Sequence, residues 1–101
     1  MKLVYQISSL ALEDLDSIWE FTRVNWSIDQ ADKYYFEILS AIDLICQYPE
    51  MGESIYPIKE LHRKMLVGSH MIIYQLDNND DKILIDRILH QRMDFENLLG
   101  V

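Results

Sequence analysis

The sequence predicts an α+β domain in which an antiparallel sheet packs against a pair of helices. Two apolar runs near the C-terminus, rich in Ile, Leu and Tyr, are separated by the polar residues 78–81. Two helical periodicities follow one another between residues 9 and 48, and a short alternating segment precedes them. Helices and strands segregated along the chain in this way form a two-layer α+β domain.

Length and composition fit a single domain that covers residues 1–101. Half of the 101 residues are hydrophobic, which is enough for one core. The net charge of −8 and the pI near 4.6 disfavour long-range attraction to nucleic acid or to an anionic membrane. Cys46 is expected in the core. Because the chain shows no possible internal disulfide, signal peptide or long apolar run, we expect a cytoplasmic protein without a membrane span.

Two helices in immediate succession are predicted between residues 9 and 48. Ser8 and Ser9 can cap the first helix, since a serine hydroxyl accepts hydrogen bonds from amides of the first turn. Ser27 and Gln30 have the spacing of a capping box at the start of the second helix, which Pro49 ends. Apolar residues recur at helical steps, namely Leu12, Leu15, Ile18, Trp19, Thr22 and Trp26, then Ala31, Tyr34, Tyr35, Ile38, Ala41, Ile42 and Ile45. The short connection predicts an αα-hairpin.

Four strands are predicted around these helices. Residues 2–7 alternate and form the first strand. Residues 61–67 form the second, and a tight turn at Gly68 leads into the strand 70–76. A hairpin joins that strand to residues 83–89, and both strands are apolar on two faces, as is typical of the centre of a covered sheet. The last three strands are therefore expected to form an antiparallel meander.

The other segments are expected to connect or end these elements. Residues 50–60 contain one glycine and one proline and alternate poorly, which predicts a loop. Asp94 can cap a short terminal helix, with Met93 and Leu98 at the spacing of a hydrophobic staple. The predicted order is β-α-α-β-β-β with a short C-terminal helical turn.

Polar residues gather at the end of the last predicted strand. Asp86, His90 and Arg92 share one face of that strand if no bulge intervenes. There, His90 could exchange protons near neutral pH and Arg92 could hold a phosphate or a carboxylate. Alternatively, Arg92 pairs with Asp86 or Asp94, and His90 only ends the strand. Spacing alone favours this alternative, because polar residues commonly end strands.

Basic residues also stand out in the strand 61–67 of this acidic chain. His62 and Lys64 share one face, and Arg63 lies on the other. They could meet an acidic partner or a phosphate backbone. Equally, charged residues on an edge strand prevent pairing between sheet edges. Neither His62, His70 and His90 nor the single cysteine has metal-ligand spacing, and we expect no metal and no cofactor.

Several segments together resemble the RelE/ParE toxin superfamily. They are the N-terminal ISSLALEDLDSIWEFTRVNW, the Tyr-rich second helix, the YPEMG break, the VGSHMIIYQL strand and the closing ILIDRILHQRMD. The resemblance spans nearly the whole chain and rests on the order, spacing and total length of these segments, since no single motif is diagnostic. It implies the same β-α-α-β-β-β order that the residues predict.

The RelE-like branch of this superfamily cleaves messenger RNA on the ribosome. It uses basic residues on the second strand, an arginine near the start of the third, and an arginine and a tyrosine near the end. This sequence keeps Lys64 and Arg92 and has His62 at another basic position. Met71 stands where the arginine would be, and no tyrosine follows Arg92. If the chain is such a ribonuclease, the candidate catalytic residues are His90, Arg92, Lys64 and His62.

The ParE-like branch matches this pattern better and is associated with poisoning DNA gyrase, without an active site of its own. The resemblance thus implies a toxin of a type II, plasmid-stabilising module that binds DNA gyrase, does not bind DNA directly, and forms a hetero-oligomer with a ParD-like antitoxin. Candidate partner-binding residues are Arg63, Lys64, His90, Arg92, Met93 and Asp94. The alternatives are a RelE-like ribosome-dependent ribonuclease and a non-toxic interaction domain of the same fold.

Overall fold

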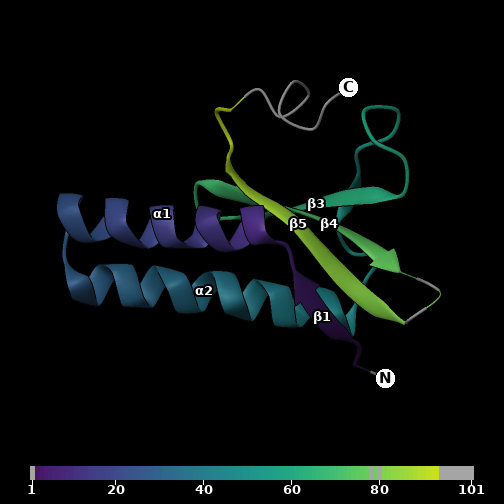
Figure 1. Ribbon diagram of the computed structural model, residues 1–101, viewed down its shortest axis with the longest axis horizontal. Helices are drawn as coiled ribbons and strands as arrows, with labels where there is room; N and C mark the ends of the chain where they lie inside the picture. The colour runs from purple at the N-terminus through teal and green to yellow at the C-terminus, as the bar shows by residue number, and fades with distance from the viewer. Residues whose placement is uncertain (1, 78, 80, 94–101) are drawn as a thin grey trace.

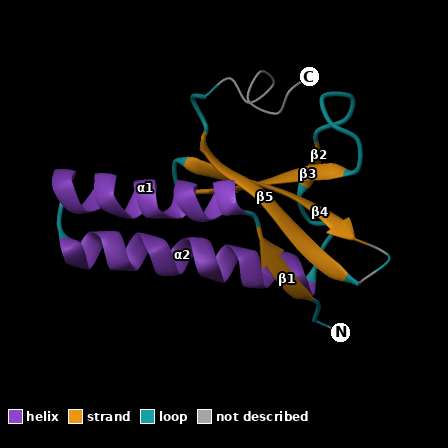
Figure 2. Ribbon diagram, in the orientation of Figure 1, coloured by secondary structure: helices purple, strands orange, loops and turns teal. Residues whose placement is uncertain are grey.

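Two helices cover one face of a sheet in the computed structural model (Figure 1). The structure describes residues 2–77, 79 and 81–93. Within these residues the elements are β1 Val4–Ile7, α1 Ser9–Asn25, α2 Ile28–Gln47, β2 Glu53–Ser54, β3 His62–Val67, β4 His70–Asp77 and β5 Lys82–His90. Figure 2 shows the helix layer and the strand layer side by side, which confirms the predicted α+β class.

The predicted helix boundaries are confirmed within one or two residues. The Ser8 hydroxyl accepts a hydrogen bond from the Ala11 amide at 3.0 Å, and α1 starts directly after this cap. The Ser27 hydroxyl accepts from the Gln30 amide at 3.0 Å in the same way. Helix α2 ends at Gln47, two residues before the proline, so the two helices form the predicted αα-hairpin.

The sheet is mixed rather than purely antiparallel, with the order β1-β5-β4-β3-β2. Strands β3, β4 and β5 form the predicted antiparallel meander, but β1 pairs parallel to β5. This orientation follows because the chain leaves β1 directly into α1, whose first turn is tied to β5: the Ser8 amide donates to the Ile85 carbonyl at 3.0 Å. The predicted loop over 50–60 also contains a short strand, β2, paired with β3.

Buried residues lie on both faces of the sheet. On the helix side, Ile72, Tyr74 and Ile85 join the buried residues of α1 and α2 in one core, which also contains Cys46, as predicted. On the other side, a smaller cluster consists of Ile55, Met71, Ile73 and Leu89. Both central strands are thus covered on two faces, as their apolar sequences indicate.

The buried face of α1 differs from the predicted stripe. Ala11, Leu15 and Thr22 are buried, whereas Leu12 is 48% exposed and Trp26, which follows the helix, is 69% exposed. The small Ala11 faces the sheet because the cap at Ser8 brings the helix start close to β5. The other end of the helical hairpin projects beyond the sheet (Figure 1), which leaves Trp26 without a strand to cover it.

A β-bulge interrupts the pairing of β4 with β5. Ile73 lies opposite Arg87 and Tyr74 lies opposite Ile85, so no residue of β4 lies opposite Asp86. The Asp86 carbonyl accepts a hydrogen bond from the Ser8 hydroxyl at 2.6 Å. Next to it, Asp14 of α1 accepts two hydrogen bonds from the Arg87 guanidinium and one from the Ile88 amide, all at 2.9 Å. The bulge therefore holds the first two turns of α1.

Two parts of the predicted fold lie outside the described residues. They are the short helical turn from Asp94 onwards, and Asn78 and Asp80 of the polar turn between β4 and β5.

We expect the substitution Asp14→Asn to destabilise the fold by about 2–3 kcal/mol, because it leaves a largely buried arginine without its charged partner. Urea denaturation measures this change. Asp16→Asn is the matched control, since Asp16 is an exposed acid on the same helix, and its effect should stay within about 0.5 kcal/mol. Equal stability of the two variants would contradict an anchoring role for Asp14.

Candidate functional site

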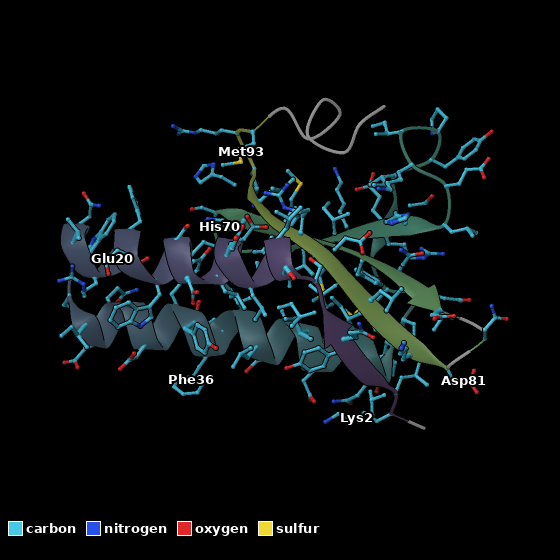
Figure 3. The ribbon with its side chains drawn as sticks, in the orientation of Figure 1. Lys2, Glu20, Phe36, His70, Asp81 and Met93 are labelled. Carbon is cyan, nitrogen blue, oxygen red and sulfur yellow. The ribbon has the colours of Figure 1, made fainter. Side chains whose placement is uncertain are left out.

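A groove of about 610 Å³ runs between the helical hairpin and the end of the sheet. Helices α1 and α2, the β3–β4 turn and the end of β5 all contribute to it. Its lining is mostly apolar and consists of Ser17, Ile18, Phe21, Thr22, Trp26, Gln30, Tyr34, Ser69, His70, His90 and Met93. Figure 3 labels His70 and Met93, which lie on the same side of the helical hairpin. The groove brings together residues that are up to 76 positions apart in the sequence.

Tyr34 of α2 holds the turn that forms one wall of this groove. Its hydroxyl donates to the Val67 carbonyl at 3.1 Å and accepts from the Ser69 amide at 3.0 Å. Gly68 is required between them: its φ is +55°, and a Cβ there would lie 2.5 Å from the Tyr34 ring. Burial raises the pKa of the Tyr34 hydroxyl, which keeps it a neutral hydrogen-bonding group.

Two histidines from neighbouring strands meet at the end of the groove. The ring centroids of His70 and His90 are 5.2 Å apart in an edge-to-face arrangement. The Nδ1 atom of His70 is 2.7 Å from the Tyr34 hydroxyl, and Nδ1 of His90 accepts from the Arg92 amide at 3.1 Å. Burial and the nearby His90 lower the pKa of His70, while Asp14 acts in the opposite direction. This end of the groove therefore favours the neutral form of His70.

The predicted alignment of Asp86 with His90 is wrong, because it required a strand without a bulge. Asp86 contacts His62 instead, with 2.5 Å between Oδ2 and Nε2. His62 lies opposite Gln75 and has the parity of the sheet face that points away from the helices. His90, in contrast, lines the groove on the helix side. The two candidate histidines thus lie on opposite faces of the sheet.

His62 is buried between two hydrogen-bond acceptors. Its Nδ1 atom is 2.6 Å from the Glu60 carbonyl, and its Nε2 atom faces the Asp86 carboxylate. Both ring nitrogens of His62 are therefore within hydrogen-bond distance of an oxygen atom. Only 6% of His62 is exposed. With both nitrogens occupied, His62 has no free atom for a substrate and instead joins β3 to β5.

The other predicted basic residues take part in separate contacts. Lys64 lies 3.8 Å from Glu53 of β2. Arg63 points to the opposite face, as predicted, where its guanidinium donates to the Gly52 carbonyl at 2.7 Å. Arg92 and Met93 follow β5 and are exposed, and Met93 lines the groove. The predicted partner residue Asp94 lies outside the described residues.

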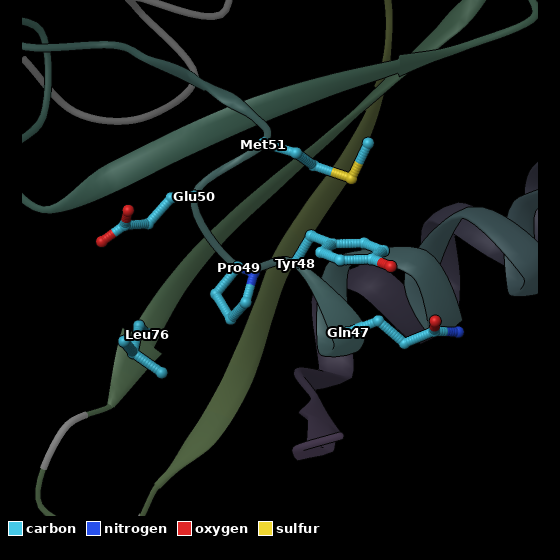
Figure 4. A pocket seen from close by; sticks show the side chains of 6 residues that line it. All are labelled: Gln47, Tyr48, Pro49, Glu50, Met51 and Leu76. Carbon is cyan, nitrogen blue, oxygen red and sulfur yellow. The ribbon is translucent and has the colours of Figure 1, made fainter. Parts of the chain in front are cut away.

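A second, more open hollow of about 550 Å³ lies at the C-terminal end of α2 (Figure 4). It is lined by Gln47, Tyr48, Pro49, Glu50, Met51 and Leu76. The buried Tyr74 hydroxyl holds this segment of chain by donating to the Pro49 carbonyl at 2.7 Å and accepting from the Gly52 amide at 3.0 Å. Among the residues that line this hollow, Glu50 and Tyr48 have ionisable side chains and the others do not. The hollow therefore offers no carboxylate–histidine or carboxylate–lysine pair for acid–base catalysis.

Metal ligation finds no support among the described residues, which contain no group of three or more His, Cys, Asp or Glu side chains placed to hold an ion. None of the described helices is long and apolar enough to cross a membrane.

Sequence reasoning missed Tyr34 and His70 as groove residues. The sequence pattern places Tyr34 in the helical core stripe and His70 only at the start of a strand. Pairing counted from the β4–β5 turn, where Asp77 lies opposite Lys82, would place His70 opposite Leu89. The bulge adds one residue to β5 and so brings His90 opposite His70. The predicted hairpin included His70 but ended at residue 89, and its register depended on the bulge.

Sequence comparison relates this arrangement to known proteins. The family of ParE toxins of type II toxin–antitoxin systems, parDE, matches residues 5–95. The chain belongs to the ParE toxin family. Toxin ParE1 of Mycobacterium tuberculosis is 36% identical over 95 residues, which cover 94% of this chain and 96% of that protein. Toxin ParE1 of Caulobacter vibrioides is 32% identical over 96 residues, with 95% and 97% coverage.

Solved structures confirm the ParE fold. A chain of the chromosomal ParDE system from P. aeruginosa superposes with a TM-score of 0.75 at 18% identity, covering 88% of this chain and 96% of that one. A free double-arginine mutant of E. coli RelE superposes with a TM-score of 0.71 at 9% identity, with 97% and 93% coverage. Both toxin branches therefore share this fold, and the fold alone does not separate them.

Acidification is expected to destabilise the fold through His70. The pKa of His70 is lowered from its ordinary value of 6.5, so the folded state binds this proton more weakly than the unfolded chain. The free energy of unfolding should therefore fall as the pH drops below about 6.5, and this loss is complete below the folded-state pKa.

The measurement compares wild type with His70→Asn by urea denaturation at about pH 8 and about pH 5. The variant should lose less stability between the two pH values than wild type does. Comparing each protein with itself removes the constant cost of the lost contact to Tyr34. An identical loss in both proteins would exclude His70 as its source.

Proposed function

We propose that this ParE-family toxin inhibits DNA gyrase by binding it and that a cognate antitoxin neutralises the toxin. The observation that carries the proposal is the separation of the candidate ribonuclease residues. In-line cleavage of RNA needs a base, an acid and a phosphate clamp that converge on one phosphate. His62 is held by Asp86 on one sheet face, whereas His90 lies on the other. Such a distribution supports a binding mechanism over a catalytic one.

Charge supports the same proposal. Ribosomal RNA is a polyanion, and a protein that acts on it gains affinity from an excess of lysine and arginine. This chain has a net charge of −8. A protein target is therefore a better match than RNA, and we expect no direct contact with DNA.

Neutralisation by an antitoxin is supported by the relatives and by the surface. The P. aeruginosa structure is described as a ParDE toxin–antitoxin system. The groove between the helices and the sheet is apolar, and exposed apolar grooves of this size are typical of interaction sites. We propose a hetero-oligomer of this toxin with its antitoxin in the cytoplasm, which stabilises the replicon that encodes the pair.

The first test is induced expression of the chain alone, with DNA supercoiling and messenger RNA integrity measured in the same cultures. We expect growth arrest, impaired supercoiling and intact transcripts, and co-expression of the antitoxin should restore growth. Purified toxin should also inhibit gyrase on relaxed plasmid. Cleaved transcripts with normal supercoiling would instead identify a ribonuclease, and harmless expression would identify a non-toxic interaction domain.

The double substitution of His90 and Arg92 by alanine separates binding from catalysis. A gyrase inhibitor should lose at most affinity, so that more toxin is needed for the same inhibition of supercoiling. A ribonuclease that used these residues as base and clamp would lose about 100-fold or more in cleavage rate. Circular dichroism checks that the variant is folded. Lys59→Ala, between β2 and β3 and outside the candidate residues, is a control and should leave gyrase inhibition unchanged.

A further inference from the structure

His70 is a titratable side chain in the lining of a mostly apolar groove. It is partly buried, together with His90 from the neighbouring strand and Tyr34 from α2. The chain on either side is held as well, because the Gln91 amide donates to the Ser69 carbonyl at 2.9 Å. His70 therefore has a fixed position at the end of the groove, where a bound partner would cover it.

The hydrogen bonds of Tyr34 assign the proton of the neutral His70 ring. A carbonyl oxygen can only accept, so the single hydroxyl proton of Tyr34 goes to Val67. Nδ1 of His70 is then the donor in its 2.7 Å contact with that hydroxyl, which leaves the lone pair of the ring on Nε2. Acid adds the second proton at Nε2. Protonation of His70 thus changes the charge in the groove without removing the hydrogen bond that holds its wall.

The groups around His70 do little to stabilise a positive charge there. Asp14 of α1 favours the charged form, but the Arg87 guanidinium already pairs with both carboxylate oxygens at 2.9 Å. His90 of β5 opposes the charged form, with its ring centroid 5.2 Å away. Tyr34 of α2 is held neutral, and the described groove lining contains no residue of β3. Burial and His90 outweigh Asp14, and the pKa of His70 is lowered.

A partner that fills the groove would remove the remaining water from His70. A charge that loses its water without gaining an opposite charge is costly, and the surrounding lining is mostly apolar. The neutral ring is covered at a smaller cost, because its Nδ1 proton already has an acceptor in Tyr34. Binding of a partner and protonation of His70 therefore oppose each other, by the same linkage that couples protonation to folding.

We propose that His70 makes the antitoxin complex acid-sensitive: the antitoxin binds the toxin in which His70 is neutral, and protonation of His70 weakens the complex. This rests on the proposed neutralisation by an antitoxin that covers the groove. The affinity is complete above the pKa of His70 in the isolated toxin, and it falls by up to tenfold for each pH unit below that value. A drop in pH thus releases the toxin, whichever target it then binds.

The direct test is a titration of the histidine rings by nuclear magnetic resonance, in the isolated full chain and in its complex with the purified cognate antitoxin. The pKa of His70 should be lower in the complex by about one unit or more, which corresponds to a tenfold effect on affinity. Isothermal titration calorimetry should show weaker binding at about pH 5 than at about pH 7.5. Circular dichroism checks that the toxin is folded at both pH values.

Two variants separate His70 from other groups that titrate in this range, including those of the antitoxin. His70→Asn retains an N–H donor but has no titratable ring, so its affinity should change less between the two pH values than that of wild type. His90→Asn removes a group that opposes charge on His70, so its loss of affinity should begin at a higher pH. Each protein is compared with itself, which removes any constant change in affinity.

The outcomes distinguish this inference from the proposed neutralisation. Absence of binding at about pH 7.5 would contradict both. Binding with the same pH dependence in wild type and in His70→Asn would contradict only the role of His70. Tighter binding of wild type in acid, lost in His70→Asn, would also overturn the inference, because the antitoxin would then bring a carboxylate to the charged ring.

Discussion

The β-bulge at Asp86 is the constraint on which the arrangement of both layers depends. Because Asp86 has no partner in β4, its carbonyl can accept from Ser8 while the next two residues meet Asp14. One irregularity in a strand thus fixes the start of α1, and through it the direction of β1 beside β5. An arginine and a carboxylate that are 73 positions apart hold this junction. Such non-local contacts, rather than helix propensity, place the helix layer on the sheet.

The same bulge decides which polar residues share a face. It turns Asp86 toward His62 and brings His90 opposite His70, beside Tyr34. The chain therefore has two separate polar contacts instead of one convergent site. The buried His62 joins strands through Asp86, whereas the pair of histidines opens into an apolar groove. For a member of the ParE family, this division favours a surface that binds proteins.

The helix layer of this toxin carries most of the negative charge of the chain. A shared fold leaves the target open, since specificity comes from the side chains placed on it. Here an acidic layer borders an apolar groove that contains two exposed aromatic side chains. Burial of these aromatic side chains would supply affinity for a partner.

The sequence by itself determined most elements of this protein: both helices with their serine caps, the αα-hairpin and the antiparallel meander. These follow from local periodicity and capping, which depend on neighbouring residues. It also placed Met93 and His90 among candidate partner residues, and both line the groove. Only the tertiary structure decided the parallel β1, the strand β2, the face of Asp86 and the meeting of Tyr34, His70 and His90. Each of these depends on a bulge or a pairing between distant segments, and a one-residue change in register moves every side chain to the other face.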